Sequence, residues 1–256
     1  MGSSETAGST KETSYISTGI PGLDELLEGR GFPSGHLVFM LGSPGSGKTT
    51  AAFQFLTYGC EIGEKGVYVT LDETPEDLVK NMQRYGLDIE EYIREKKLSM
   101  VDATPIRRFP GKVQLGAISI GKRDFSLASL IGAIQAHVKE MDAKRLVIDP
   151  ITSFLLQFPQ EEEVRTACMD LMEGIAPLGC TTLFLSELKD TATERKYQFE
   201  EYLAHGVILA RRILRANGMI QSIQIEKMRG VDHDVNPHPY KFTPKGIEVF
   251  PSEQVL

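Results

Sequence analysis

Eight consecutive residues have the composition and spacing of a phosphate-binding loop. Residues 42–49 read Gly-Ser-Pro-Gly-Ser-Gly-Lys-Thr and match G-x-x-x-x-G-K-[ST] at every fixed position. Glycines in this pattern let the backbone turn tightly and direct its N–H groups at phosphate oxygens, and the N-terminus of a following helix adds partial positive charge. The pattern predicts that Lys48 reaches the β- and γ-phosphates of a nucleoside triphosphate and that the Thr49 hydroxyl binds Mg²⁺.

The alternative is a glycine-rich turn that carries Lys-Thr by chance. We favour phosphate binding because an apolar strand pattern precedes the loop and a helical pattern follows it, which is the context that the motif requires. The residues predicted to contact the nucleotide from this segment are Gly42, Ser43, Pro44, Gly45, Ser46, Gly47, Lys48, Thr49 and Thr50.

A second acidic residue is needed to hold the water shell of the metal, and Asp149 is the best candidate. It ends the apolar run 145–149, and ligands bind at the carboxyl ends of strands in open α/β sheets. The predicted metal site therefore consists of Thr49 and Asp149. The alternative role of Asp149 is to start a turn before Pro150.

Three further carboxylates end predicted strands and are candidates for work at the γ-phosphate. Asp72 and Glu73 close the second predicted strand, where an acidic base could polarise the attacking water. Their alternative role is to cap the helix that begins at Pro75. Glu187 ends a later strand, where it would sense the γ-phosphate through water or lie in solvent as an ordinary strand end. Residue chemistry alone leaves both choices open.

The elements that position these groups alternate along the chain. Strands are predicted at residues 36–42, 66–72, 97–103, 145–150, 181–187, 206–213 and 222–228. Helical patterns are predicted at residues 18–27, 48–60, 75–85, 126–141 and 161–178. Residues 104–125 have no clear period and are predicted to form an irregular functional loop. The repeated strand–helix–strand order predicts an α/β fold with a mostly parallel central sheet flanked by helices, and an antiparallel pairing of the last two strands.

Length and composition narrow the class of protein. The 256 residues suit a single domain at residues 14–251 with tails at 1–13 and 252–256. A net charge of −7 with interspersed signs gives no overall attraction to nucleic acid or to an anionic membrane. The three cysteines are predicted to be buried thiols of a reducing compartment, and no apolar run approaches the roughly 20 residues that span a bilayer. The N-terminus is not a secretory signal, so we expect a cytoplasmic protein with no membrane partner.

Taken together, these motifs resemble the KaiC-like ATPases of the RecA/RadA superfamily, in the single-domain form common in archaea. The resemblance runs from Thr18 to Phe250. Its segments are STGIPGLDELLEGRGFPSGHLVFMLGSPGSGKTT, YVTLDETPEDL, RLVIDPIT, FEEYLAHGVILARR and IEKMRGVDH. The resemblance implies a RecA-like P-loop ATPase core with a C-terminal antiparallel β portion. It also implies that the protein hydrolyses ATP to ADP and phosphate with Mg²⁺, in a regulatory or signalling role.

Two positions depart from the family pattern. Asp72 stands where the family usually has the first of two glutamates, which makes Glu73 the preferred catalytic base, and Pro150 stands where serine is more usual. The circadian clock members have two such domains and phosphorylate an adjacent Ser-Thr pair. This chain has one domain, and Thr191 and Thr193 are not such a pair, so we do not transfer autophosphorylation or timekeeping.

The resemblance also assigns roles to the segment Lys-x-Arg-Gly-x-x-His. In the family this segment points into the nucleotide site of the neighbouring subunit, which implies that Lys227 and Arg229 act in trans on the γ-phosphate, with His233 at the matching position. Residues two apart on a strand face the same side, so both cations can cross one interface. A site completed between subunits implies a homo-oligomer, expected to be a hexameric ring. The alternative is a solvated strand edge, which lysines often protect.

Relatives of RecA often bind DNA through loops that line the ring, and this chain has three clusters of cations that suit such contacts. They are Arg107–Arg108 with Lys112, Lys122–Arg123, and Arg211, Arg212 and Arg215. Phe109 and Phe125 flank the first two clusters, where stacking aromatics would assist binding to single-stranded DNA. The alternative, exposed cations that balance an acidic chain, is slightly favoured by the modest local charge. A nucleotide-dependent DNA-binding protein or partner of a recombinase is therefore the second functional hypothesis.

Overall fold

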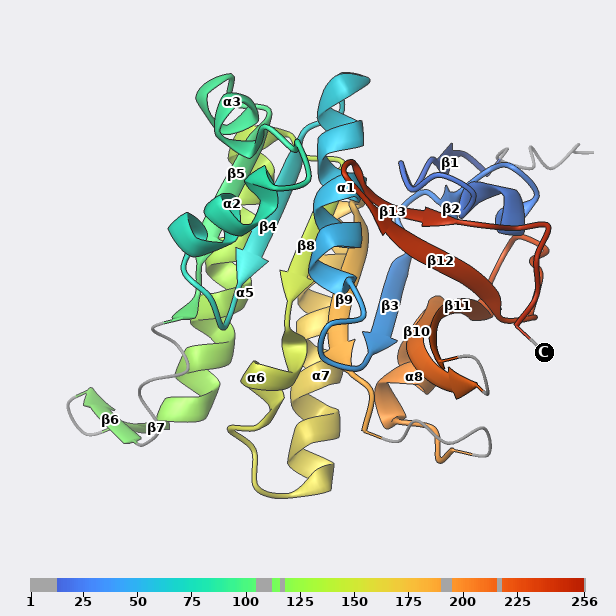
Figure 1. Ribbon diagram of the computed structural model, residues 1–256. Coiled ribbons are helices and arrows are strands. Elements are labelled where there is room, and N and C mark those ends of the chain that lie inside the picture. Colours follow the sequence, from blue (N-terminus) through green and yellow to red (C-terminus); the bar gives the residue numbers. More distant parts are fainter. Residues whose placement is uncertain (1–12, 105–111, 116–117, 190–194, 216–217, 256) are drawn as a thin grey trace, which may run out of the picture.

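Figure 1 shows the computed structural model, which describes residues 13–104, 112–115, 118–189, 195–215 and 218–255. Its centre is a nine-stranded sheet with the order β13-β12-β11-β10-β3-β9-β8-β4-β5. Six neighbouring strands are parallel: β10 (Gly206–Arg215), β3 (Leu37–Gly42), β9 (Thr181–Glu187), β8 (Arg145–Asp149), β4 (Gly66–Thr70) and β5 (Leu98–Asp102). The remaining strands pair in antiparallel fashion: β11 (Gly218–Met228), β12 (His238–Thr243) and β13 (Gly246–Val249). The predicted α/β class, with its antiparallel C-terminal portion, is confirmed.

Helices cover both faces of the sheet. One face carries α1 (Lys48–Glu61), α2 (Pro75–Gln83) and α3 (Ile89–Arg94). The other face carries α5 (Lys122–Met141), α6 (Ile151–Leu155), α7 (Glu161–Ile175) and α8 (Phe199–Leu203). Two small antiparallel pairs stand outside the sheet: β1 (Tyr15–Ile16) with β2 (Phe32–Pro33), and β6 (Lys112–Leu115) with β7 (Ile118–Gly121).

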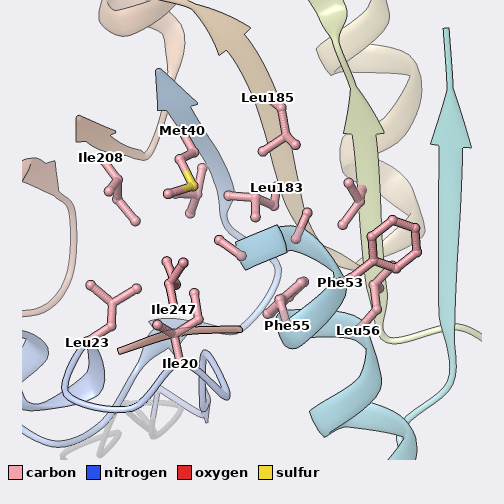
Figure 2. Close-up of a cluster of buried hydrophobic side chains, with 14 of the residues drawn as sticks. Ile20, Leu23, Met40, Phe53, Phe55, Leu56, Leu183, Leu185, Ile208 and Ile247 are labelled. Atoms are coloured by element: carbon pink, nitrogen blue, oxygen red, sulfur yellow. The ribbon is translucent and has the colours of Figure 1, made fainter. Parts of the chain in front are cut away.

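Alternation along β3 divides the core into two layers. Val38 and Met40 pack on the side of α1, whereas Leu37, Phe39 and Leu41 belong to the cluster under α5 and α7. Figure 2 shows the first layer, in which side chains of α1 pack against the sheet and against the N- and C-terminal segments. Burial on both faces is the reason why the central strands are apolar at nearly every position.

The described parts of the stretch 104–125 are more regular than the sequence predicts. This stretch contains the β6–β7 hairpin, and α5 begins at Lys122 rather than at the predicted Ser126. Each hairpin strand has only four residues, which is too short for its alternation to stand out from irregular chain. The helix predicted at 161–178 ends earlier, because α7 stops at Ile175 and a 3-10 turn follows at Ala176–Leu178. Pro177 lies in that turn and has no N–H to continue the α-helix. Near the N-terminus, only Asp24–Leu27 of the predicted helical lead-in is helical.

Three smaller features bear on the predictions from composition. Within the described ranges, no helix is long and apolar enough to cross a membrane. The three cysteines are free and buried, as predicted. Close to the C-terminus, Val255 is buried and its N–H donates to the Pro237 carbonyl over 2.8 Å, so this end of the chain packs on the body of the protein.

Candidate functional site

The parallel strands bring the predicted catalytic groups to one edge of the sheet. The phosphate loop follows β3, Glu187 ends β9, Asp149 ends β8, and the pair Asp72–Glu73 follows β4. In the pairing register, Gly42 lies opposite Glu187, and Thr70 lies opposite Asp149. These strands all run in the same direction, toward the end at which the loop leads into α1 (Figure 1). The carboxyl edge is where open α/β sheets bind ligands.

Two glycines are required for the tight closure of the loop. Gly47 has φ 81°, in the left-handed region, and a Cβ at this position would lie 2.9 Å from the ring of Phe242. At Gly42, a Cβ would lie 2.5 Å from the Ala210 carbonyl oxygen on β10. Neither position accepts a side chain, so the glycines of the motif are explained by close packing as well as by the turn.

Lys48 lies within the loop. Its ammonium donates to the carbonyls of Gly42, over 2.7 Å, and Ser43, over 3.1 Å. Burial lowers the pKa of Lys48, and the negative charges of Asp149 and Glu187 oppose that shift. The cation therefore faces the carboxylates of β8 and β9 at the place where a phosphate chain would balance its charge.

Ser46 lies at the inner side of the loop and helps to hold it against the sheet. Its side chain is fully buried, and its hydroxyl has no hydrogen-bond partner among the described residues. Its carbonyl accepts a hydrogen bond from the Tyr240 hydroxyl over 2.5 Å, which fixes the loop against β12. A buried hydroxyl without a partner is unfavourable, and this one lies against Gly42 at the inner side of the loop.

Asp149 is the centre of a buried hydrogen-bond cluster. Its carboxylate accepts from the Thr49 hydroxyl over 2.9 Å and from the Tyr68 hydroxyl. Burial raises the pKa of Asp149, and the hydrogen bonds from Tyr68 and Thr49 and the charge of Lys48 oppose this. Among the described residues, no group of three or more His, Cys, Asp or Glu side chains could hold a metal unaided. Thr49 and Asp149 fit Mg²⁺, which is usually bound by one or two protein oxygens together with phosphates and water.

Glu73 lies near this cluster. Its negative charge contributes to the raised pKa of both Asp149 and Tyr68. Its backbone carbonyl accepts from the Thr70 hydroxyl over 2.5 Å, and its exposed carboxylate accepts from the Asn81 side chain over 3.2 Å. The structure thus holds Glu73 at its backbone and leaves the carboxylate open to solvent. Asp72, its neighbour, is also exposed.

Thr74, rather than Asp72 or Glu73, caps α2. The Thr74 hydroxyl accepts from the Asp77 N–H over 3.2 Å and is the N-cap, as its position before Pro75 suggests. Glu73 is therefore not needed as the cap of α2. Glu187 has its backbone N–H bonded to the Thr152 hydroxyl over 3.0 Å and an exposed side chain.

The predicted trans-acting residues lie at the opposite edge of the sheet. On β11, Lys227 pairs with Val207 and Met228 pairs with Gly206, and Gly206 in turn lies opposite Val38 near the start of β3. The phosphate loop leaves the other end of β3, at Gly42. The separation between Met228 and Gly42 is therefore about 13 Å along the strands and about 10 Å across two strand spacings. Lys227 and Arg229 do not belong to the phosphate site of their own chain.

These residues share a surface hollow instead. Lys227, Arg229 and His233 line a hollow of about 600 Å³ together with Tyr197 and Tyr202. The Lys227 ammonium donates to the Glu201 carbonyl over 2.9 Å. Burial lowers the pKa of Lys227, and the nearby positive charge of Arg229 lowers it further. The predicted segment thus lies on one surface, which Glu201 and Glu226 also line, and its role in trans stays a prediction.

The structure describes only some side chains of the three predicted basic clusters. Arg107 and Arg108 lie outside the described residues, as do the side chains of Lys112, Lys122, Arg123 and Arg215. Arg211 donates to the Gln224 side chain over 3.0 Å, whereas Arg212 lies beside Gly45 of the phosphate loop. Adjacent strand residues point to opposite faces, so these two arginines do not form one patch. Contact with single-stranded DNA or a recombinase stays a prediction.

A sequence profile of the KaiC ATPase family matches residues 16–254, nearly the whole chain. The chain belongs to the KaiC ATPase family. Membership of this family implies nucleotide binding, in agreement with the loop and the cluster around Asp149. The predicted resemblance to KaiC-like, RecA-type ATPases is confirmed.

Several known proteins resemble the chain over most of its length. A UPF0273 protein of Thermotoga maritima is 34% identical over 93% of this chain and 96% of its own length. A UPF0273 protein of Pyrococcus furiosus is 33% identical over 93% of this chain and 94% of its own length. The crystal structure of a KaiC-like protein from Pyrococcus horikoshii is 34% identical, covers 94% of this chain and 100% of its own, and superposes with a TM-score of 0.79. The circadian clock oscillator protein KaiC of Synechococcus elongatus is 32% identical, but the match spans only 44% of that protein.

Sequence reasoning missed three aromatic residues of this KaiC-family site. Tyr68 is fully buried in β4 and donates to Asp149. Tyr240 holds the loop at Ser46, and Phe242 lies against Gly47 with its ring stacked near Tyr85 at 6.2 Å. In a sequence, an aromatic residue within a strand is interpreted as part of the hydrophobic core. Contacts between β12 and the loop join residues far apart in the chain, and Tyr240 and Ser46 are separated by 194 positions. No local signal marks such a contact.

Proposed function

We propose that this protein hydrolyses ATP to ADP and phosphate at interfaces between its own copies, with Lys227 and Arg229 of one copy completing the site of the next. The observation that carries this proposal is the position of both cations at the amino edge of the sheet, opposite to the phosphate loop. A γ-phosphate on the loop of one copy meets them only if they come from another copy. Head-to-tail contacts of this kind close into a ring, and the family resemblance suggests six copies.

Each group of the carboxyl edge has a role in this reaction. Lys48 and the backbone N–H groups of the loop hold the β- and γ-phosphates, and Thr49 and Asp149 would hold Mg²⁺, which would neutralise phosphate charge. Glu73 accepts a proton from water as the water oxygen attacks the γ-phosphorus and the bond to the β–γ bridging oxygen breaks. Glu187 orients that water from the end of β9. Asp72 is a weaker contributor because its side chain is one carbon shorter.

Lys227 and Arg229 stabilise the negative charge that develops on the transferred phosphoryl group. An arginine supplied from a neighbour accelerates phosphoryl transfer by about 10³–10⁵-fold in other nucleoside triphosphatases. Without such a neighbour the site lacks this stabilisation of the transferred phosphoryl group, so hydrolysis depends on assembly. This dependence suits a regulatory or signalling ring, and the three free thiols suit the reducing cytoplasm.

Two single variants test the proposal by separating binding from turnover. Lys48→Ala is expected to abolish ATP binding, because it removes the cation that balances the phosphates. Arg229→Ala is expected to bind ATP like the wild type and to release phosphate about 10³-fold more slowly. Arg165→Ala, at an exposed arginine of α7, is the matched control and is expected to change neither quantity. Wild-type turnover in the Arg229→Ala variant would remove the trans role.

A further inference from the structure

The backbone of Arg229 is held from both sides by two histidines. Its N–H donates to the His205 carbonyl over 2.9 Å, and its carbonyl accepts from His36 Nε2 over 2.9 Å. His36 lies just before β3 and His205 lies just before β10, so both anchors come from the amino edge of the parallel strands. The residue that follows is held as well, because the Tyr15 hydroxyl donates to the Gly230 carbonyl over 3.1 Å.

The two histidines also fix each other. Their ring centroids are 4.8 Å apart at 45°, and His205 Nδ1 accepts from the Leu37 N–H over 3.0 Å. An accepting Nδ1 carries no proton, and His36 Nε2 must carry one in order to donate to a carbonyl. Burial lowers the pKa of both rings, and the positive charge of Arg229 lowers both as well. A neutral ring is required at His205, whose Nδ1 accepts, whereas His36 donates from Nε2, and its hydrogen bond to the Arg229 carbonyl opposes the lowering of its pKa.

The Arg229 side chain, by contrast, is exposed and has no hydrogen bond or ion pair with any described residue. The backbone at Arg229 therefore sets the point from which the guanidinium extends. A hydrogen bond that fixes that backbone fixes the point from which the cation reaches the neighbouring site, and a misplacement of about 1 Å can lower a rate about 100-fold.

We infer that His36 is a positioning residue for catalysis in trans: its hydrogen bond to the Arg229 carbonyl directs that cation into the nucleotide site of the next copy. This inference rests on the proposed function. It assigns His36 to the neighbour's reaction, although His36 lies at the edge of the sheet opposite to the phosphate loop of its own chain.

Mixed rings test the inference because they place the defect on one side of an interface. A His36→Ala copy keeps its own nucleotide site but offers a misplaced Arg229. A Lys48→Ala copy lacks a nucleotide site but offers an intact Arg229. Rings co-assembled from His36→Ala and an excess of Lys48→Ala are expected to release phosphate at least about 5-fold faster than the sum of the two variants assayed alone. His36→Ala alone is expected to have about 10- to 100-fold lower kcat and an unchanged KM for ATP.

Parallel mixtures keep the outcomes distinct. Arg229→Ala with Lys48→Ala must show the same gain if Arg229 acts in trans. A gain there without a gain for His36→Ala would overturn the inference and leave the proposed function standing. No gain in either mixture would overturn both. Restored turnover in the mixture also shows that the His36→Ala chain is folded.

Two substitutions test the hydrogen bond itself. His36→Gln retains an N–H donor and is expected to keep at least half of the wild-type kcat. A folded His36→Gln variant with the kcat of His36→Ala would contradict a hydrogen-bonding role. His137→Ala, at a half-buried histidine of α5 that contacts Ser99, is the matched control and is expected to leave kcat unchanged.

Discussion

The Thr49 hydroxyl donates a hydrogen bond to the Asp149 carboxylate over 2.9 Å, although the two residues are 100 positions apart in the chain. This contact joins the phosphate loop after β3 to the end of β8, with β9 lying between the two strands. A hydroxyl and a carboxylate in this arrangement form a ready pair of oxygen ligands beside the place for the phosphates.

Asp149→Asn separates function from stability. Burial raises the pKa of Asp149, so the folded protein disfavours its charge, and a neutral amide of the same shape removes that penalty. We expect phosphate release with saturating Mg²⁺ to fall about 10³-fold and the thermal midpoint to stay equal or rise. A lower midpoint together with wild-type turnover would contradict the assigned role.

Tyr68→Phe tests the support of the metal ligand. Tyr68 donates to Asp149 from within the buried sheet, and loss of such a partner typically weakens metal affinity or activity about 10- to 100-fold. A titration of phosphate release against Mg²⁺ is expected to need correspondingly more metal. Tyr92→Phe, which removes a surface hydroxyl 3.5 Å from Glu61, is the control and should leave the titration unchanged.

The acidic pair after β4 is tested by comparing Glu73→Gln with Asp72→Asn. Glu73→Gln is expected to bind ATP normally and to lose about 10²- to 10⁴-fold in turnover, the usual contribution of a general base. Asp72→Asn is expected to lose far less. If the two variants lost turnover equally, or if Asp72→Asn lost more, the base would have to be reassigned.

The histidine pair makes the free energy of unfolding depend on pH. The folded pKa of His205 lies below its ordinary value of 6.5, through burial and the charges of His36, Arg229 and Lys227. The unfolded chain therefore binds more protons as the pH falls below about 6.5, and this contribution to stability is present above that pH and lost below it. His205→Asn keeps an acceptor for the Leu37 N–H and removes the titration. Urea unfolding at pH 7.5 and 5.5 is expected to show a smaller loss of stability in His205→Asn, and an equal loss would refute this account.

The sequence predicts the parts of the fold and of the site that local pattern determines. The loop at 42–49 and the strands that end at Glu187 and Asp149 are each marked by a motif or by a continuous apolar run. Parallel order then places their ends together, because strands of a parallel sheet share one carboxyl edge.

Contacts between distant segments could not be predicted in this way. Phe242 on β12 packs against Gly47, but Pro239 and the polar residues of β12 hide its place in the sheet from a reading of the sequence. In the sequence, His36 is simply the first residue of a predicted strand, and only the antiparallel return of β11 brings Arg229 to it. Pairings of this kind depend on topology, which a single sequence does not specify.

The claim that one copy holds only part of the site is tested most directly by measuring ATP turnover per chain as the protein is diluted. Phosphate release and molar mass are measured on the same samples over a range of protein concentrations with ATP and Mg²⁺. We expect turnover per chain to fall in step with the loss of the oligomer and to reach at most about one thousandth of its plateau when the mass is that of a single chain. A constant turnover per chain down to the single-chain mass would contradict the account.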